Sequence, residues 1–323
     1  MRARRLVRSV CIAALVCAIA LANIAPVEAQ VGVDEQSIEE HPAGADIDFS
    51  YPQIGVPNAD GMLRDLATSL LDGFKTTLAA RTSSEPRYSA QLSNSVTRND
   101  DSAVVVVFDY SFYTGGAHPN FTRLTFNFLM PDGTRVFLPD LIGNDGVQRV
   151  SDVSIADLTR KLSSTGSADA SWIATGAGPF ADNFESFEWQ PSELVVHFDP
   201  YAVASYADGP QEVHIPLSRL TDVLRPDPRA PLPSFECANA TTDIENAICS
   251  DQALAQLDRR VAEAYAMRLR LEALGNTQPT VQAQQVQWLA QRDADCSAVA
   301  DAALVECLKS EYSDRLTALG SFN

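Results

Sequence analysis

A proline-rich segment separates two parts of the chain that differ in hydrophobic period, and this difference limits the possible folds more than any other feature. Four of the ten residues from Arg225 to Ser234 are proline. Before this segment, apolar residues alternate in strand-like runs or recur at helical spacing, whereas after it every apolar pattern is helical. We therefore predict an α+β domain with an antiparallel sheet, followed by a small all-α helical bundle. We expect the proline segment to be an extended linker that spaces the two domains by up to about 30 Å.

The first 29 residues have the three parts of a secretory signal peptide. Arginines at positions 2, 4, 5 and 8 precede an apolar stretch over residues 10–22, and Val27-Glu28-Ala29 offers a cleavage site. We expect cleavage near Ala29 and a periplasmic or secreted protein. Residues 30–47 are acidic and lack a hydrophobic pattern, so we predict a disordered lead-in there.

Removal of the signal peptide makes an acidic chain more acidic. The full sequence has a formal net charge of −18, whereas residues 30–323 have 20 basic and 41 acidic side chains, a net of −21. This charge argues against nucleic acid as a partner, because phosphate binding needs clustered Lys and Arg, and against docking on an anionic membrane. No later apolar run approaches 18 residues, so we predict no membrane insertion. A basic protein partner is compatible with the charge.

The α+β domain is predicted at residues 48–224 from two helices and several strands. Apolar residues at a spacing of three to four predict helices over 62–78 and 151–162. Alternation with a period of two predicts strands at 104–112, 124–130, 194–198 and 212–216. Pro131-Asp132-Gly133 predicts a turn into a further strand over 134–138.

The helical domain is predicted at residues 235–323, after the linker at 225–234. A capping box at Thr242 and Glu245 begins a short helix. Apolar stripes predict three longer helices, over residues 254–269, 281–292 and 304–319.

Four cysteines remain after signal cleavage, and all of them lie in the helical domain: Cys237, Cys249, Cys296 and Cys307. An even number in an exported chain predicts two disulfides, for which three pairings are possible. Sequential pairing would close two short loops and stabilise each by roughly 3 kcal/mol. A zinc site is the alternative, but the sequence has no CxxC motif and no histidine after His214.

Motifs for common enzyme chemistry are missing from the sequence. It contains no GxSxG, HExxH, GxGxxG or GxxxxGK[ST]. His118, His197 and His214 lie far apart without the spacing of metal ligands. We therefore predict that the protein is not an enzyme and uses no metal and no cofactor.

The first candidate binding site is a glycine-containing segment between two strongly patterned strands. It comprises Tyr113, Thr114, Gly115, Gly116 and His118. Adjacent glycines permit positive φ angles and close approach of the backbone to another molecule. The segment is either a ligand-facing loop or an unusual hairpin connection.

The second candidate binding site lies on a predicted helix of the bundle. Trp288 and Arg292 are one turn apart, so their side chains can stack and present an interface anchor. A tryptophan in such a stripe can equally be part of the bundle core. Both interpretations stay open at this point.

The helical domain resembles the LprI-type lysozyme-inhibitor family of small exported bacterial domains. The likeness runs through Phe235-Glu-Cys237-Ala, Asp243-Ile-Glu245-Asn-Ala-Ile-Cys249, Leu254, Leu257-Asp258, Tyr265, Gln287-Trp288-Leu289, Arg292-Asp293, Cys296, Cys307-Leu308, Tyr312 and Arg315-Leu316. The four-cysteine pattern of that family implies the sequential disulfide pairing.

The preceding region resembles the extracytoplasmic domain of the anti-sigma factor RsiV, which is also found beside the catalytic domain of the peptidoglycan deacetylase PdaC. The likeness runs through Tyr51-Pro52-Gln53-Ile54, Tyr113-Thr-Gly-Gly-Ala-His118, Phe126-Asn-Phe128, Phe137-Leu-Pro-Asp140-Leu141 and Phe198-Asp-Pro-Tyr201-Ala-Val-Ala-Ser-Tyr206-Ala-Asp-Gly209-Pro210. In RsiV this module binds lysozyme. The sequence has no segment resembling the sigma-binding part, membrane helix or deacetylase domain of those proteins.

Both resemblances imply the same kind of partner, a lysozyme-type muramidase, which is a basic enzyme. We therefore expect an exported binding protein that captures or inhibits such an enzyme. The alternative is a cell-envelope module that binds peptidoglycan or an envelope protein without inhibiting anything.

Overall fold

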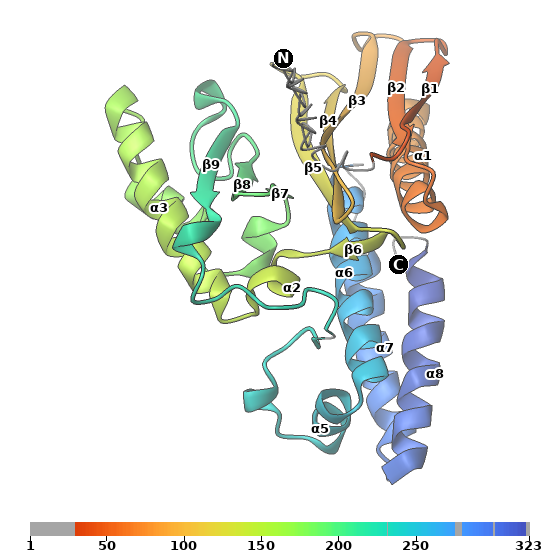
Figure 1. The fold of residues 1–323 in the computed structure, drawn as a ribbon. Coiled ribbons are helices and arrows are strands. Elements are labelled where there is room, and N and C mark those ends of the chain that lie inside the picture. The colour runs from red at the N-terminus through yellow and green to blue at the C-terminus, as the bar shows by residue number, and fades with distance from the viewer. Residues whose placement is uncertain (1–29, 231, 275–279, 300, 321–323) are drawn as a thin grey trace, which may run out of the picture.

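The computed structural model describes residues 30–230, 232–274, 280–299 and 301–320, and the predicted signal peptide lies outside them. In the described α+β region (residues 30–224), six strands form one sheet in chain order and three form another (Figure 1). The strands are β1 (Asp34–Glu40), β2 (Ala45–Gln53), β3 (Tyr88–Asn99), β4 (Ala103–Tyr113), β5 (Asn120–Leu129), β6 (Thr134–Val136), β7 (Phe187–Trp189), β8 (Glu193–Phe198) and β9 (Gln211–Pro216). The helices are α1 (Pro57–Ala79), α2 (Leu138–Ile142), α3 (Gly146–Thr165) and α4 (Ala170–Gly176).

The predicted α+β class is confirmed, with one difference in strand direction. The strand pairs are antiparallel except β2 and β3, which run parallel. Helix α1 connects these two strands, as a parallel pair requires a crossover. The predicted antiparallel sheet therefore contains one parallel pair.

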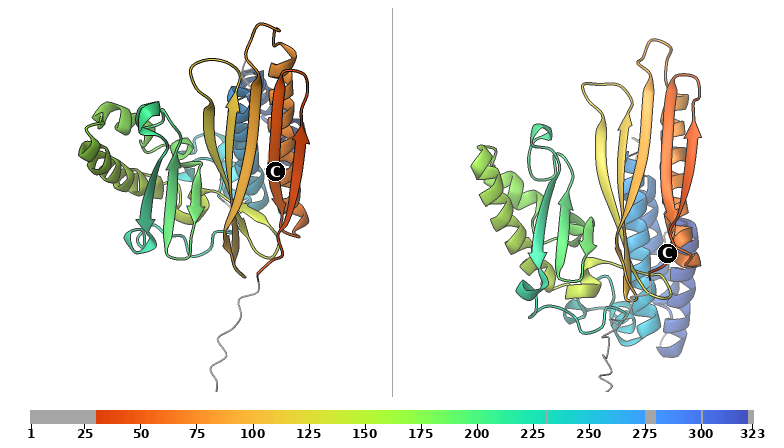
Figure 2. Two further views of the ribbon diagram at one scale, coloured as in Figure 1. Left: turned by 90° about the horizontal axis from the view of Figure 1, so that it is seen from above. Right: turned by 45° about the horizontal axis from the view of Figure 1, so that its top comes forward.

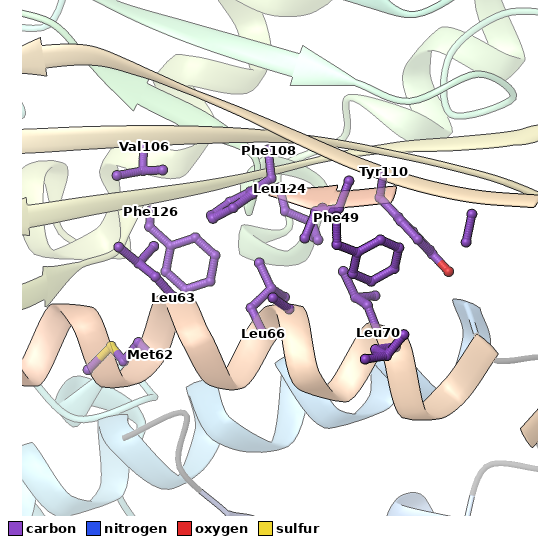
Figure 3. Packing of buried hydrophobic residues seen from close by; sticks show 14 of the residues in the cluster. Phe49, Met62, Leu63, Leu66, Leu70, Val106, Phe108, Tyr110, Leu124 and Phe126 are labelled. Atoms are coloured by element: carbon purple, nitrogen blue, oxygen red, sulfur yellow. The ribbon is translucent and has the colours of Figure 1, made fainter. Parts of the chain in front are cut away.

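Helix α1 covers one face of the six-stranded sheet and forms its core. Leu63, Leu66 and Leu70 of the helix face the aromatic side chains of Phe49 and Phe126 (Figure 3). The apolar stripe that predicted this helix is therefore its buried face.

The second sheet lies against the opposite face of the first. The Asn127 side chain of β5 donates to the carbonyl oxygen of Phe187 at 2.9 Å and accepts from the amide of Trp189 at 2.8 Å. The amide of Phe187 also donates to the Thr125 hydroxyl at 2.9 Å. Because strands β4 and β5 are covered on both faces, β4 has a continuous buried run from Ala103 rather than a strict alternation.

Residues 30–47 contain ordered strands, so the prediction of a disordered lead-in was wrong. Strand β1 pairs antiparallel with β2 along its whole length, from Asp34 opposite Gln53 to Glu40 opposite Ile47. Strand β1 lies at the sheet edge and packs only Ile38 against the core. An acidic edge strand shows little hydrophobic alternation, and its charges oppose pairing with another chain.

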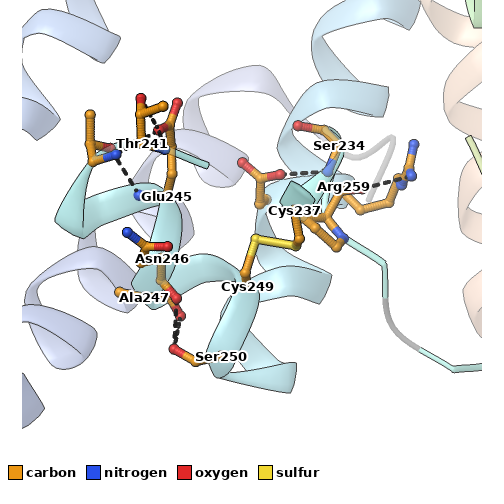
Figure 4. The surroundings of a disulfide bond; sticks show 12 residues. Ser234, Cys237, Thr241, Glu245, Asn246, Ala247, Cys249, Ser250 and Arg259 are labelled. Atoms are coloured by element: carbon orange, nitrogen blue, oxygen red, sulfur yellow. Dashed lines mark hydrogen bonds between the residues drawn. A yellow bond between two sulfur atoms is a disulfide. The ribbon is translucent and has the colours of Figure 1, made fainter. Parts of the chain in front are cut away.

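The helical region (residues 235–320) contains α5 (Asp243–Ser250), α6 (Gln252–Leu274), α7 (Thr280–Cys296) and α8 (Asp301–Leu319). The predicted capping box is present, with the amide of Glu245 donating to the Thr242 hydroxyl at 3.1 Å. The sequential disulfide pairing is confirmed: Cys237 bonds to Cys249 (Figure 4), and Cys296 bonds to Cys307. None of the described helices is long and apolar enough to cross a membrane.

The proline segment lies against the α+β region and does not hold the two regions apart. The amide of Arg225 donates to the Leu141 carbonyl oxygen at 2.7 Å, and Arg229 donates to the Met130 carbonyl oxygen at 2.7 Å and to Asp132. These hydrogen bonds and the ion pair hold the proline segment on the α+β region. The expectation of an extended spacer was therefore wrong.

Helix α6 packs on the six-stranded sheet beside α1, so it has two buried faces (Figure 2). One face, with Leu254 and Val261, belongs to the helical core. The other face contributes Met267 and Leu271 to the core of the first sheet. Arg259 strengthens this junction by donating to the Asn144 side chain at 3.2 Å.

Glu263 is a buried carboxyl group on the junction face of α6. Burial raises its pKa well above the usual range, and the nearby Asp140 adds to this effect, whereas Arg259, Arg135 and Arg260 oppose it. The Nε atom of Arg259 lies 3.9 Å from Oε1 of Glu263, beyond hydrogen-bond distance. Oε1 has no hydrogen-bond partner among the described residues.

We expect the Glu263→Gln variant to be more stable than the parent at neutral pH. The pKa of Glu263 is higher in the folded protein than in the unfolded chain, where it is about 4.5. The stability that the protonated group retains below pH 4.5 is therefore lost as the pH rises toward the folded-state pKa. Glutamine has no charge to bury, so we expect a gain of about 1–2 kcal/mol at pH 7 and a smaller gain at pH 5. Urea unfolding at both pH values measures it, with the exposed Glu306→Gln as control. An equal effect at both pH values would contradict the prediction.

Candidate functional site

The predicted glycine segment is the tip of the β4–β5 hairpin. Gly115 and Gly116 have φ angles of +96° and +108°, which side-chain-bearing residues rarely adopt. The Tyr113 hydroxyl donates to the Gly116 carbonyl oxygen at 3.1 Å and closes the turn. Tyr113 thus supports the loop from the end of its strand, while Thr114 and the glycines form the connection itself.

His118 stacks on Tyr206, which comes from the loop between β8 and β9. The ring centroids are 3.7 Å apart and the planes are inclined by 19°. Nδ1 of His118 lies 2.9 Å from the Pro119 carbonyl oxygen, and because a carbonyl only accepts, Nδ1 carries a proton. The Tyr206 hydroxyl donates to the same carbonyl at 2.8 Å. These bonds hold the two loops together.

Tyr201 completes an aromatic cluster with His118 and Tyr206. Its hydroxyl lies 3.4 Å from Nε2 of His118, and its ring centroid lies 5.6 Å from that of Tyr206. Its side chain is 54% exposed, although its φ of +72° is rare for a residue other than glycine. Nε1 of Trp172 donates to the Tyr201 carbonyl oxygen at 2.9 Å. An exposed ring on a constrained backbone is typical of binding sites.

Asp199 ties the base of this β8–β9 loop to both regions of the protein. It accepts from the Arg123 amide at 2.8 Å and from the Thr122 hydroxyl, both in β5. It also accepts from Arg270 of α6 at 3.2 Å, and Arg270 contacts Glu185 at 3.6 Å. The helical region therefore helps to position the loop that presents the aromatic cluster.

Trp288 and Arg292 belong to a polar network inside the helical bundle. The Trp288 ring packs edge-on against Tyr312 with centroids 5.2 Å apart, and the Arg292 guanidinium lies 5.4 Å from the Trp288 ring. Arg292 donates to the Tyr312 hydroxyl at 2.7 Å, which itself donates to Asp258 at 2.7 Å. Neighbouring Leu289 is partly exposed. The network fixes α7 against α8.

The structure thus brings His118 of the predicted site together with two tyrosines that the sequence did not assign to any site. Tyr201 and Tyr206 lie in the Phe198–Pro210 segment that carried the family likeness, and this was the available signal. The structure does not bring the hairpin tip and the Trp288 network into one cluster. The described residues include no group of three His, Cys, Asp or Glu side chains that could hold a metal ion.

Comparison with known families identifies both regions of the chain. Residues 136–218 match a family described as "Protein of unknown function (DUF3298)", and residues 237–319 match the family "Lysozyme inhibitor LprI". The chain therefore carries a DUF3298 region, which includes the β8–β9 loop, followed by an LprI region with both disulfides. The predicted likenesses to LprI and to part of PdaC are confirmed, whereas the likeness to RsiV itself stays a prediction.

The relatives include one curated protein and two solved structures. The peptidoglycan-N-acetylmuramic acid deacetylase PdaC of Bacillus subtilis is 28% identical over 124 residues, which cover 38% of this chain and 26% of PdaC. The chain thus spans about a quarter of that relative's length. A DUF3298 protein of Pseudomonas aeruginosa is 18% identical with a TM-score of 0.48, covering 62% of this chain and 97% of that one. A DUF3298 protein of Bacteroides fragilis is 15% identical with a TM-score of 0.44, covering 62% and 96%.

Proposed function

We propose that this protein is exported and captures a lysozyme-type muramidase, which it inhibits by covering the substrate cleft. One observation carries the proposal: the region that matches the lysozyme inhibitor LprI family also holds, through Arg270, the loop that presents the aromatic cluster. Both regions would then contribute to one binding surface. The signal-peptide pattern and the two disulfides support export, because disulfides persist in oxidising compartments.

The charge of the chain supports a basic partner. Residues 30–234 have a net charge of −15 and residues 235–323 a net charge of −6, so the acidity lies mainly on the region with the aromatic cluster. An acidic surface accelerates encounter with a cationic enzyme, and salt weakens this steering. We expect lysozyme binding to be fastest at low ionic strength.

In the proposed complex the tip of the β4–β5 hairpin and the aromatic cluster make the first contact. Tyr201 offers a large, partly exposed ring with a polar end, and tyrosine is enriched among residues that dominate interface energies. The second proposed contact is the helix face around Trp288 and Arg292. There the polar network around Trp288 would keep α7 rigid, and Leu289 and its exposed neighbours would contact the enzyme.

We expect the Tyr201→Asn variant to bind hen-type lysozyme at least about tenfold more weakly than the parent. Asparagine tolerates a positive φ, so this substitution removes the ring without straining the backbone. Phe180→Ala is the matched control, because Phe180 is an exposed aromatic residue outside the cluster. Leu289→Ala tests the second contact. Binding is measured by calorimetry at low salt, together with a muramidase assay.

Absence of both binding and inhibition by the folded mature protein at low salt would overturn the proposed function. Binding without inhibition would favour the alternative of a non-inhibitory envelope module. The likeness to PdaC, whose name refers to peptidoglycan, favours glycan as the ligand in that case. Sedimentation with isolated peptidoglycan distinguishes the two, since a lysozyme inhibitor has no need to bind the glycan. In either case we propose a binding role and no enzymatic one.

A further inference from the structure

Two cavities lie at the junction of the two regions, away from the aromatic cluster. The smaller, of about 150 Å³, has mainly apolar walls that include Leu124, Phe184, Phe187 and Met267. The larger, of about 330 Å³, lies between the proline segment and α6. The two share four lining residues: Arg135, Phe137, Arg259 and Glu263. They are therefore adjacent, and together they reach the size of small-molecule pockets, about 300–1,000 Å³.

Arg135 lines both cavities, and its charge has no ion-pair partner among the described residues. Its guanidinium carbon lies 4.2 Å from the Phe126 ring centroid and 4.5 Å from that of Phe137. Its buried Nη1 has no hydrogen-bond partner in the described ranges, and no described carboxylate lies within 4.0 Å of it. Burial lowers the pKa of Arg135 to about 10, which still leaves it charged at neutral pH.

Two further buried polar atoms at this position also lack partners within the described part of the chain. They are Nε of Arg259 and Oε1 of Glu263. The other arginine of the smaller cavity, Arg270, is paired with Asp199. A buried donor without a partner costs free energy, so three orphaned polar atoms around one space indicate that something else fills it.

We propose that these cavities form one binding site for a small organic carboxylate with a compact apolar body. The ligand carboxylate would accept from Nη1 of Arg135 and Nε of Arg259, in the charge-assisted geometry that guanidinium groups favour. Its apolar body would enter the smaller cavity against Phe184 and Met267. A protonated Glu263 would donate to the same carboxylate.

The charges and dimensions of the site select this class of ligand. Of the two arginines that line both cavities, Arg135 alone has no ion pair within the described residues, and Glu185 and Asp140 lie nearby, so a doubly charged phosphate would be repelled. A cavity of about 150 Å³ accommodates roughly one benzene ring. Helix α6 provides Arg259 and Met267, so the site exists only when the two regions are docked.

Benzoate is the probe that tests this site in the full mature protein. Benzamide is its uncharged analogue, and acetate has the carboxylate but no ring. We expect saturable one-to-one binding of benzoate by calorimetry and a matching rise in melting temperature. Benzamide and acetate should each bind at least about tenfold more weakly. Absence of saturable benzoate binding, or equal binding of benzamide, would overturn the proposal and point to a cavity filled by water.

Two variants locate the site by independent changes. Arg135→Gln removes the charge and should weaken benzoate binding at least about tenfold, whereas the exposed Arg160→Gln should leave it unchanged. Ala266→Leu on α6 fills the smaller cavity without altering any charge and should also abolish binding. Unaltered binding in a folded Arg135→Gln or Ala266→Leu protein would overturn the proposal. Ala266→Leu keeps every charged group, including Arg135. It therefore tests the site separately from Arg135→Gln, whose loss of charge could affect folding.

Discussion

Replacing Met267 by aspartate is expected to separate the helical region from the α+β region. Met267 is buried in the core of the six-stranded sheet although it belongs to α6. An uncompensated buried charge costs about 3–5 kcal/mol, and undocking of the helix avoids this cost. Arg229 lines a cavity that α6 closes from the other side, so undocking of the helix would expose it. We expect trypsin to cleave after Arg229, which precedes Ala230, at least about tenfold faster than in the parent.

Ala253→Asp is the matched control for this prediction, because Ala253 is an exposed residue of the same helix. It should leave the cleavage rate unchanged. Small-angle scattering gives a second measurement, since undocking increases the radius of gyration. A compact Met267→Asp protein with parental protease resistance would show that α6 contributes little to the junction.

Loss of the Cys296–Cys307 disulfide is expected to have the second large effect. The bridge joins cysteines 11 residues apart and connects the end of α7 to α8. Serine at both positions should lower the stability of the helical region by about 3 kcal/mol, because the unfolded chain is no longer constrained. The contact of Trp288 with Tyr312 would be weakened as well, since it lies between the same two helices.

Thermal unfolding followed by far-ultraviolet circular dichroism measures this loss as an early helical transition. The double serine variant of Cys237 and Cys249 is the comparison, because that bridge closes a loop of nearly the same length, with a separation of 12. We expect similar losses from the two variants. A change below about 1 kcal/mol in the Cys296 and Cys307 variant would contradict the prediction.

The sequence was sufficient to predict the elements that bury a single apolar stripe. Leu63, Leu66 and Leu70 recur at helical spacing because they pack on one sheet, and the helix over them is observed. Strand β1 was missed because an edge strand buries little and its side chains are mainly polar. The parallel β2–β3 pair was missed because strand direction depends on the path of α1 through space.

The docking of the two regions could not be predicted from hydrophobic spacing. The junction face of α6 consists largely of arginines, alanines and Glu263, with Met267 and Leu271 as its apolar members. Such a face resembles a solvated one in the sequence. Burial of Arg270 follows from the complete fold, in which the carbonyl oxygen of Arg123 and the carboxylates of Asp199 and Glu185 lie around it.

The candidate site was predicted in part for a similar reason. Two adjacent glycines marked the hairpin tip, because their conformational freedom is a local property. The partners of His118 are 83 or more residues away, and only the folded chain brings Tyr201 and Tyr206 beside it. The resemblance indicated that their segment mattered without giving either tyrosine a role.

Helix α6 serves two cores, and this imposes a constraint on how the sequence can diverge. Most helices at a protein surface can change their outer residues freely, because water accepts almost any side chain. Along α6, substitutions on either side must suit a packed neighbour, and Arg270 must also keep its place beside Asp199. We therefore expect that exchanging the helical region for that of another protein would require changes on both sides of the junction.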